Sequence, residues 1–151
     1  MSTLKADTIQ TTGGVSEIAI DKLKGVSSVS SISVVGEGGT TTTDLQQGLL
    51  KSWVNFDGSA TDAAARDSFN VSGMTDNSTG NYSVAFGNNF NNAFFATSCA
   101  AGDFSGTDDP GNNQYVYNFT SGSIRMSIFN YSSGSACDIS VCTLQQSGDL
   151  S

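Results

Sequence analysis

The sequence contains no histidine, and only 13% of its 151 residues are charged. Without histidine the commonest general base is missing, so neither a Ser-His-Asp nor a Cys-His arrangement can be built. The glycine-rich stretch at 36–39 is followed by four threonines, without the Lys that a phosphate-binding loop requires. We therefore expect neither an enzyme nor a bound cofactor.

Basic residues are also scarce, with 6 Lys and Arg against 14 Asp and Glu and a net charge of −8. Clustered Lys and Arg carry the affinity for nucleic acid, and because no cluster occurs, no nucleic-acid partner is expected. No run of about 18 apolar residues occurs, so membrane insertion is not expected. The N-terminus lacks the basic-then-apolar pattern of a secretory signal, which predicts synthesis in a reducing cytoplasm.

Cysteine is rare and odd in number, whereas secreted disulfide scaffolds use even sets. Cys137 and Cys142 lie five residues apart in an alternating stretch, which predicts that they face opposite sides of one strand and do not bridge each other. We expect all three cysteines to be small, partly buried hydrophobic residues, because their spacing does not match a zinc site. A disulfide from Cys99 to one of the other two stays open.

Aromatic residues are absent before residue 50 and frequent after it, with Phe 9, Tyr 4 and Trp 1. A compact core needs large side chains, so residues 51–151 are expected to fold as one domain. Residues 1–50, called the arm from here on, must gain their order from another partner.

The arm carries isolated aliphatic residues between Ser, Asp and Lys. A monomer would leave this thin apolar stripe in water, whereas three copies wound around one axis would bury it, so we expect a homotrimer. The expected contact residues are Leu4, Ile9, Ile18, Ile20, Leu23, Val26, Val29, Ile32, Leu45 and Leu49. The alternative is a flexible linker, which the Ser-rich run at 26–31 and the Gly-rich run at 36–39 favour.

One short helix is expected where the arm meets the domain. The run from Thr43 to Gln46 has the form of a capping box, in which the Thr43 hydroxyl accepts from the Gln46 backbone N–H. Leu45 and Leu49 then fall on one face, one turn apart. Such a short helix needs packing from the domain or from other copies, and the alternative is a single turn that redirects the chain.

Short alternating segments separated by turn residues predict an all-β domain. The expected strands lie near 51–57, 66–72, 81–87, 93–101, 114–120, 123–131 and 137–145. About seven strands at ten-residue spacing favour an antiparallel, jelly-roll-like β-sandwich.

Three blocks of the sequence resemble a module of bacteriophage virion proteins: KSWVNFDG at 51–58, ARDSFNV at 65–71 and TDNSTGNYSVAF at 75–86. The resemblance is to tail-fibre and similar appendage proteins of marine phages, and MSTLKADTIQ at 1–10 looks like their N-terminal segment. It implies a structural module that contains Trp53, Phe56, Arg66, Asp67, Phe69, Tyr82 and Phe86. In this module Trp53 is expected to anchor the core, with stacking on a glycan as the alternative. Arg66 and Asp67 are expected to serve in an ion pair at the domain base or between subunits.

The resemblance implies a trimeric tail-fibre or appendage protein of the virion, assembled in the host cytoplasm. The arm would attach to other virion proteins, and the domain would project. Host-surface glycans would be contacted through distal loops around 88–92, 103–113 and 132–135. The alternative is a head-decoration protein on the capsid. A carbohydrate-active enzyme or a Ca²⁺ site would depend on Asp103, Asp108 and Asp109, which a solvated loop explains better.

Overall fold

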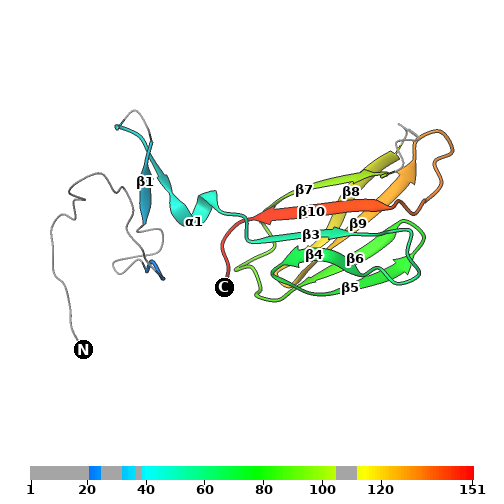
Figure 1. Cartoon of the computed structure of the whole chain (residues 1–151), viewed down its shortest axis with the longest axis horizontal. Helices are drawn as coiled ribbons and strands as arrows, with labels where there is room; N and C mark the ends of the chain where they lie inside the picture. The colour runs from blue at the N-terminus through cyan, green and yellow to red at the C-terminus, as the bar shows by residue number, and fades with distance from the viewer. Residues whose placement is uncertain (1–20, 25–31, 37–38, 105–111) are drawn as a thin grey trace.

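The computed structural model describes residues 21–24, 32–36, 39–104 and 112–151. The short hairpin and the helix of the arm lie beyond one end of the β-rich part (Figure 1). In the arm a two-stranded hairpin precedes the helix, with β1 at Ser33–Val35, β2 at Thr42–Asp44 and α1 at Leu45–Gly48.

Residues 52–147 form two four-stranded sheets that pack face to face. One sheet has the order β4-β3-β10-β7 and the other β5-β6-β9-β8, and every pairing is antiparallel. The strands are β3 (Ser52–Phe56), β4 (Ala65–Phe69), β5 (Val71–Ser78), β6 (Asn81–Phe86), β7 (Ala96–Gly102), β8 (Asn112–Thr120), β9 (Ser123–Asn130) and β10 (Val141–Ser147). The expected antiparallel sandwich is confirmed. Consecutive strands β3–β4, β5–β6 and β8–β9 pair within one sheet, so these connections are more local than the Greek-key crossings of a jelly roll.

The strand predicted at 66–72 is divided at Asn70, which accounts for one strand more than expected. Asn70 has φ of 57°, and this left-handed residue turns the chain from β4 in one sheet to β5 in the other. Its side-chain amide donates to the carbonyls of Lys51 at 2.9 Å and Asn88 at 3.1 Å. The side-chain oxygen Oδ1 of Asn70 accepts from the Asn88 backbone N–H at 2.6 Å. The corner is thus fixed by hydrogen bonds from both of its sides.

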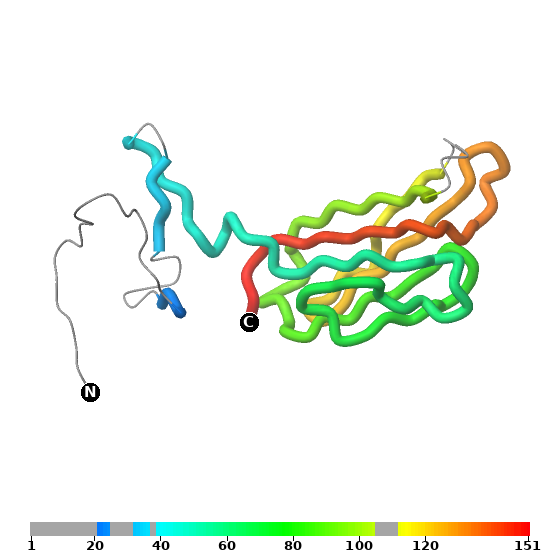
Figure 2. The backbone as a smooth tube through the Cα atoms, in the orientation of Figure 1, coloured from blue at the N-terminus to red at the C-terminus, as the bar shows by residue number. Residues whose placement is uncertain are grey.

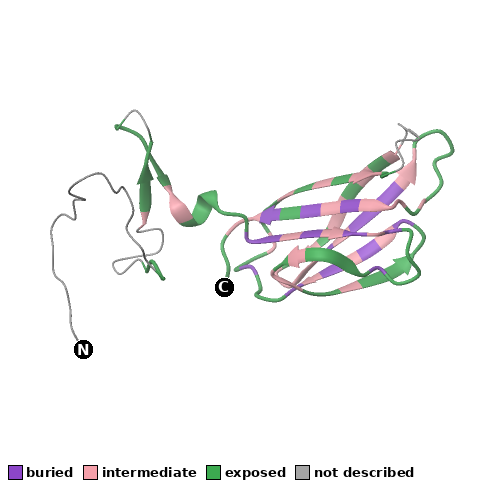
Figure 3. Cartoon of the chain, in the orientation of Figure 1, coloured by how far each residue is buried: buried purple, intermediate pink, exposed green. Residues whose placement is uncertain are grey.

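The core lies between the sheets and is lined by alternate residues of the central strands (Figure 3). Val54 and Phe56 point inward from β3, and Leu144 and Cys142 are their partners on β10. The facing sheet contributes Tyr82, Val84, Phe86, Ile124, Met126 and Ile128. Phe56 meets Tyr82 edge-on, with ring centroids 5.0 Å apart. This contact joins the two sheets directly.

The sandwich has an arm end and a far end. The chain enters β3 from the arm and leaves β10 beside it, so the arm and the C-terminus share one end (Figure 2). Phe90 forms a bridge with Leu150, and the Asn91 N–H donates to the Asp149 carbonyl at 2.8 Å. The loop at 88–92 therefore lies at the arm end, and its predicted distal position is wrong.

The far end is closed by a buried tyrosine. The Tyr82 hydroxyl donates to the Gly58 carbonyl at 2.8 Å and lies 2.6 Å from Asp138 Oδ1. The same carboxylate oxygen accepts from the Gly80 N–H at 2.6 Å. Gly80 has φ of 63°, and a Cβ there would lie 2.5 Å from the Ile128 carbonyl oxygen, so only glycine fits this turn.

The helix cap lies one residue later than predicted. Asp44 is the N-cap residue, and its carboxylate accepts from the Gln47 backbone N–H at 2.8 Å. The Gln47 side chain donates to Asp149 Oδ1 and does not reach back to complete a capping box. Leu49 follows α1 in extended conformation, so it does not share a helical face with Leu45 as predicted. Asp44 takes the N-cap position in place of Thr43 because its carboxylate accepts from a free backbone N–H of the first turn.

The three cysteines are free thiols. Cys142 is buried on β10, but Cys137 precedes that strand, so the two do not share one strand as predicted. Instead the Cys137 N–H donates to the Ile128 carbonyl at 3.2 Å, which ties the segment before β10 to β9.

Candidate functional site

The described part of the arm exposes its apolar side chains. Leu23 is 62% exposed, and Val34 and Val35 in the hairpin are exposed to a similar degree. None of the arm residues that the structure describes is buried, and α1 contributes no residue to the core. Backbone hydrogen bonds close both ends of this hairpin: the Gly36 N–H donates to the Thr41 carbonyl and the Leu45 N–H donates to the Ile32 carbonyl. The described part of the arm thus presents aliphatic groups that no other described residue buries.

Four of the predicted arm contacts lie among the described residues. Leu23 and Leu49 are exposed, while Ile32 and Leu45 are partly buried. The remaining members lie outside the described residues: Leu4, Ile9, Ile18, Ile20, Val26 and Val29. The sequence interpretation missed Val34, Val35 and Leu50, although Val34 and Val35 continue the aliphatic pattern two and three residues beyond Ile32.

The helix of the arm is joined to the sandwich by hydrogen bonds with residues just before β3 and just after β10. Lys51 is buried, and its ammonium donates to the Gln46 carbonyl of α1, while its backbone N–H donates to the Gln146 carbonyl at 2.9 Å. The Gln47 side chain donates to Asp149 beyond β10. The helix is therefore held to both the first and the last strand of the sandwich, although it buries no apolar residue there.

The structural module is divided between the core and the surface. Phe56, Tyr82 and Phe86 are core residues, whereas Phe69 is 53% exposed. Trp53 is half-buried on the outer face of its sheet, and the expectation that it anchors the core is wrong. Side chains alternate along a strand, so Trp53 and Phe56, three residues apart, face opposite sides.

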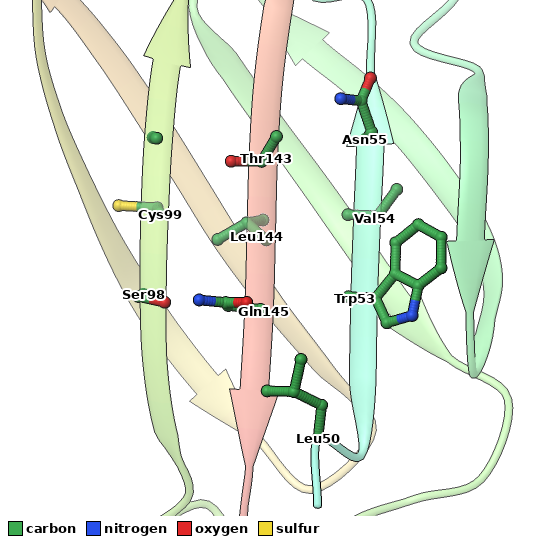
Figure 4. A pocket seen from close by; sticks show the side chains of 10 residues that line it. Leu50, Trp53, Val54, Asn55, Ser98, Cys99, Thr143, Leu144 and Gln145 are labelled. Carbon is green, nitrogen blue, oxygen red and sulfur yellow. The ribbon is translucent and has the colours of Figure 1, made fainter.

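A shallow hollow of about 660 Å³ lies on this outer face, over β3, β10 and β7 (Figure 4). Its lining is partly apolar, and the neutral polar residues among it are Asn55, Ser98, Thr143 and Gln145. The apolar lining residues are Leu50, Trp53, Val54, Cys99, Ala100 and Leu144. Its lining residues include no carboxylate and no basic side chain. This chemistry suits contact with another surface and provides no acid–base pair for catalysis.

Arg66 has a different partner and place from those expected. Its guanidinium lies 2.6 Å from Asp57 Oδ2, donates to the Phe56 carbonyl at 3.0 Å, and stands 5.0 Å from the centre of the Phe104 ring. Arg66 lies where the register of β4 against β3 shifts, and Asp67, which is paired with Asn55, accepts from the Ser68 backbone N–H at 2.8 Å. Since Asp57 follows the last residue of β3, the Arg66–Asp57 pair lies within this chain at the far end of the sandwich and not at the domain base. The hydrogen bond from the Ser59 hydroxyl is the main cause that lowers the pKa of Asp57. Desolvation opposes it, and the Ser59 backbone N–H and the Arg66 charge lower the pKa further.

The acidic loop is described only at its beginning. Asp103 accepts from the Ser140 hydroxyl at 2.9 Å, and Asp108 and Asp109 lie outside the described residues. Within the described ranges, no group of three or more His, Cys, Asp or Glu side chains is arranged to hold a metal ion. In those ranges no helix has the length and apolar character needed to cross a membrane.

The outer face of the second sheet carries an aromatic cluster that the sequence interpretation missed. Tyr115 stacks on Phe129 with ring centroids 5.7 Å apart, and Tyr117 lies 5.6 Å from Tyr115. Arg125 is the register partner of Tyr117 on β9. The two-residue spacing of the tyrosines could have placed them on one face, but their proximity to Phe129 and Arg125 depends on the pairing of β8 with β9.

Comparison with known proteins gives no relative: no family model, no curated protein and no solved structure matches the chain.

Proposed function

We propose that the protein is a structural component of a bacteriophage particle, a homotrimer of the tail-fibre or appendage type. The arm attaches it to other virion proteins, and the sandwich projects and contacts the host surface. The observation that carries this proposal is the exposed set of aliphatic side chains on the arm, which the sandwich does not cover. The sequence blocks that resemble appendage proteins support the same assignment.

Identical copies are the partner that best fits this arm. Its described apolar groups are few and scattered, and those of the narrow two-stranded hairpin are Val34 and Val35, so they cover less area than an interface of ordinary size. Association around a three-fold axis covers the same stripe on every copy at once. The acidic chain still permits close approach, because the aliphatic residues of β1 carry no charge.

The test compares the oligomeric state of full-length variants by light scattering. The unaltered chain is expected to be a trimer, and the double variant Val34→Asp/Val35→Asp a monomer, since three copies would place carboxylates together near the axis. Tyr131→Asp is the matched control, because Tyr131 is 73% exposed at the far end of the sandwich. A stable dimer, or a trimer that survives both aspartates, contradicts the proposal. Copy number per particle then separates an appendage from a capsid decoration protein.

A further inference from the structure

The outer face of the sheet β5-β6-β9-β8 combines aromatic rings with a single cation. Strand pairing places Tyr115 opposite Ser127 and Tyr117 opposite Arg125. The rings of Tyr115 and Phe129 are parallel to within 4°, and Tyr115 remains 49% exposed. The cluster therefore presents a flat, apolar surface beside a guanidinium.

Hydrogen bonds hold the polar part of this cluster in place. The Asn81 side-chain amide donates to the Tyr117 hydroxyl oxygen at 2.7 Å. Partial desolvation raises the pKa of Tyr117, but hydrogen bonds from Ser127, Asn81 and Arg125 to its oxygen outweigh this effect and lower the pKa. The Asn77 amide donates in turn to the Ser83 hydroxyl at 2.8 Å. These neighbours arrange the face before any ligand arrives.

Arg125 differs from the other cations of the sandwich. Arg66 is paired with Asp57, and Lys51 is buried with its ammonium on the Gln46 carbonyl. Within the described residues Arg125 forms no ion pair, and its register neighbours Ser83 and Tyr117 are uncharged. An unpaired guanidinium is unusual in a chain with more than twice as many acidic as basic residues, so the face is complementary to an external anion.

We propose that this face binds an acidic sugar, a glycan unit that carries a carboxylate. The carboxylate would sit on the Arg125 guanidinium, whose planar fork matches its geometry. The apolar C–H face of the sugar ring would lie against Tyr115, since the face of an aromatic ring attracts such groups. The sugar hydroxyls would meet the partly exposed neutral side chains Asn81 and Ser83. This inference rests on the proposed host-surface contact only for the source of the glycan.

Other anions fit the same face less well. Nucleic acids and other polyphosphates need several cations, and this face provides one on a chain of net charge −8. A neutral sugar would stack on Tyr115 but would offer Arg125 no opposite charge. A sugar ring that bears a carboxylate can contact the Tyr115 ring and the Arg125 guanidinium at the same time.

The test measures binding of tetragalacturonate and of its methyl ester to the full-length protein by calorimetry. Esterification removes the charge and keeps the sugar ring, so the acid should bind at least about tenfold more tightly than the ester. Arg125→Gln should remove this difference, and Arg125→Lys should restore only part of it because the ammonium lacks the fork. Tyr115→Ala should weaken both ligands. Melting temperatures report whether each variant is folded.

Two control variants sharpen the result. Lys24→Gln removes one positive charge from the arm, and Phe69→Ala removes an exposed aromatic ring from the other sheet. Both should bind the acid as the unaltered protein does. Equal affinity for acid and ester, no binding of either at millimolar concentration, or an unchanged preference in Arg125→Gln would overturn the inference. None of these outcomes bears on trimer formation, which light scattering measures separately.

Discussion

Replacement of Phe56 by alanine should destabilise the protein far more than replacement of Trp53. Phe56 is fully buried and meets Tyr82 edge-on across the two sheets, with the ring centroids 5.0 Å apart. Truncation of a core phenylalanine costs about 3 to 5 kcal/mol, a large share of the roughly 5 to 15 kcal/mol that stabilises a domain. Trp53 is half-buried on the outer face, so its truncation should cost about 1 kcal/mol.

The assay is urea unfolding of the full-length variants, followed by far-ultraviolet circular dichroism because Trp53 is the single tryptophan. In thermal unfolding, Phe56→Ala should lower the melting temperature by at least about 12 °C, and Trp53→Ala by less than about 8 °C. Phe69→Ala is a second outer-face variant and should behave as Trp53→Ala does. If Trp53→Ala costs as much as Phe56→Ala, the assignment of the two faces of β3 is wrong.

Three further predictions concern the corner, the ion pair and the thiols. Asn70→Ala should be less stable in urea than Asn70→Gly by about 1 kcal/mol, because both lose the side-chain hydrogen bonds and only glycine adopts the positive φ without strain; equal midpoints contradict this. Hydrogen bonds from Ser59 and the Arg66 charge lower the pKa of Asp57, so its stabilisation is full above the ordinary value of 3.8 and is lost as the pH falls through the folded pKa. Asp57→Asn should remove that acid-dependent loss from the unfolding curve, and an unchanged curve argues against the pair. Burial raises the pKa of Cys142 to about 12, so this thiol should react last with a disulfide reagent at neutral pH; equal rates for all three cysteines contradict its burial.

The class of fold could be predicted from the sequence because the signals for it are local. Alternation and turn residues predicted strands near β3, β6, β8 and β9, and the boundary between arm and core followed from the first aromatic residue. The error at Trp53 also has a local origin. The size of the side chain suggested burial, but the position of Phe56 three residues later required the opposite face.

The corner at Asn70 was harder to predict because a continuous strand and a crossing look alike in sequence. Residues 66–72 contain no glycine or proline, and asparagine adopts a left-handed conformation only when its surroundings favour it. Here those surroundings are the backbone groups of Lys51 and Asn88, which lie 19 and 18 residues away along the chain. The sequence interpretation had no means of identifying contacts at such separations.

The aromatic cluster at Tyr115 also depends on contacts between residues far apart in the sequence. Its members lie on β8 and β9, while Asn81, which fixes the Tyr117 hydroxyl, comes from β6. A face assembled from three strands keeps its geometry as long as the sheet is intact, because strand pairing holds each ring in register. The arm is attached at one end of the sandwich, through Lys51 and Gln47. In the proposed assembly, contacts made through the arm would leave the middle of this sheet uncovered. A rigid face placed there would remain accessible to the proposed glycan whichever protein binds the arm.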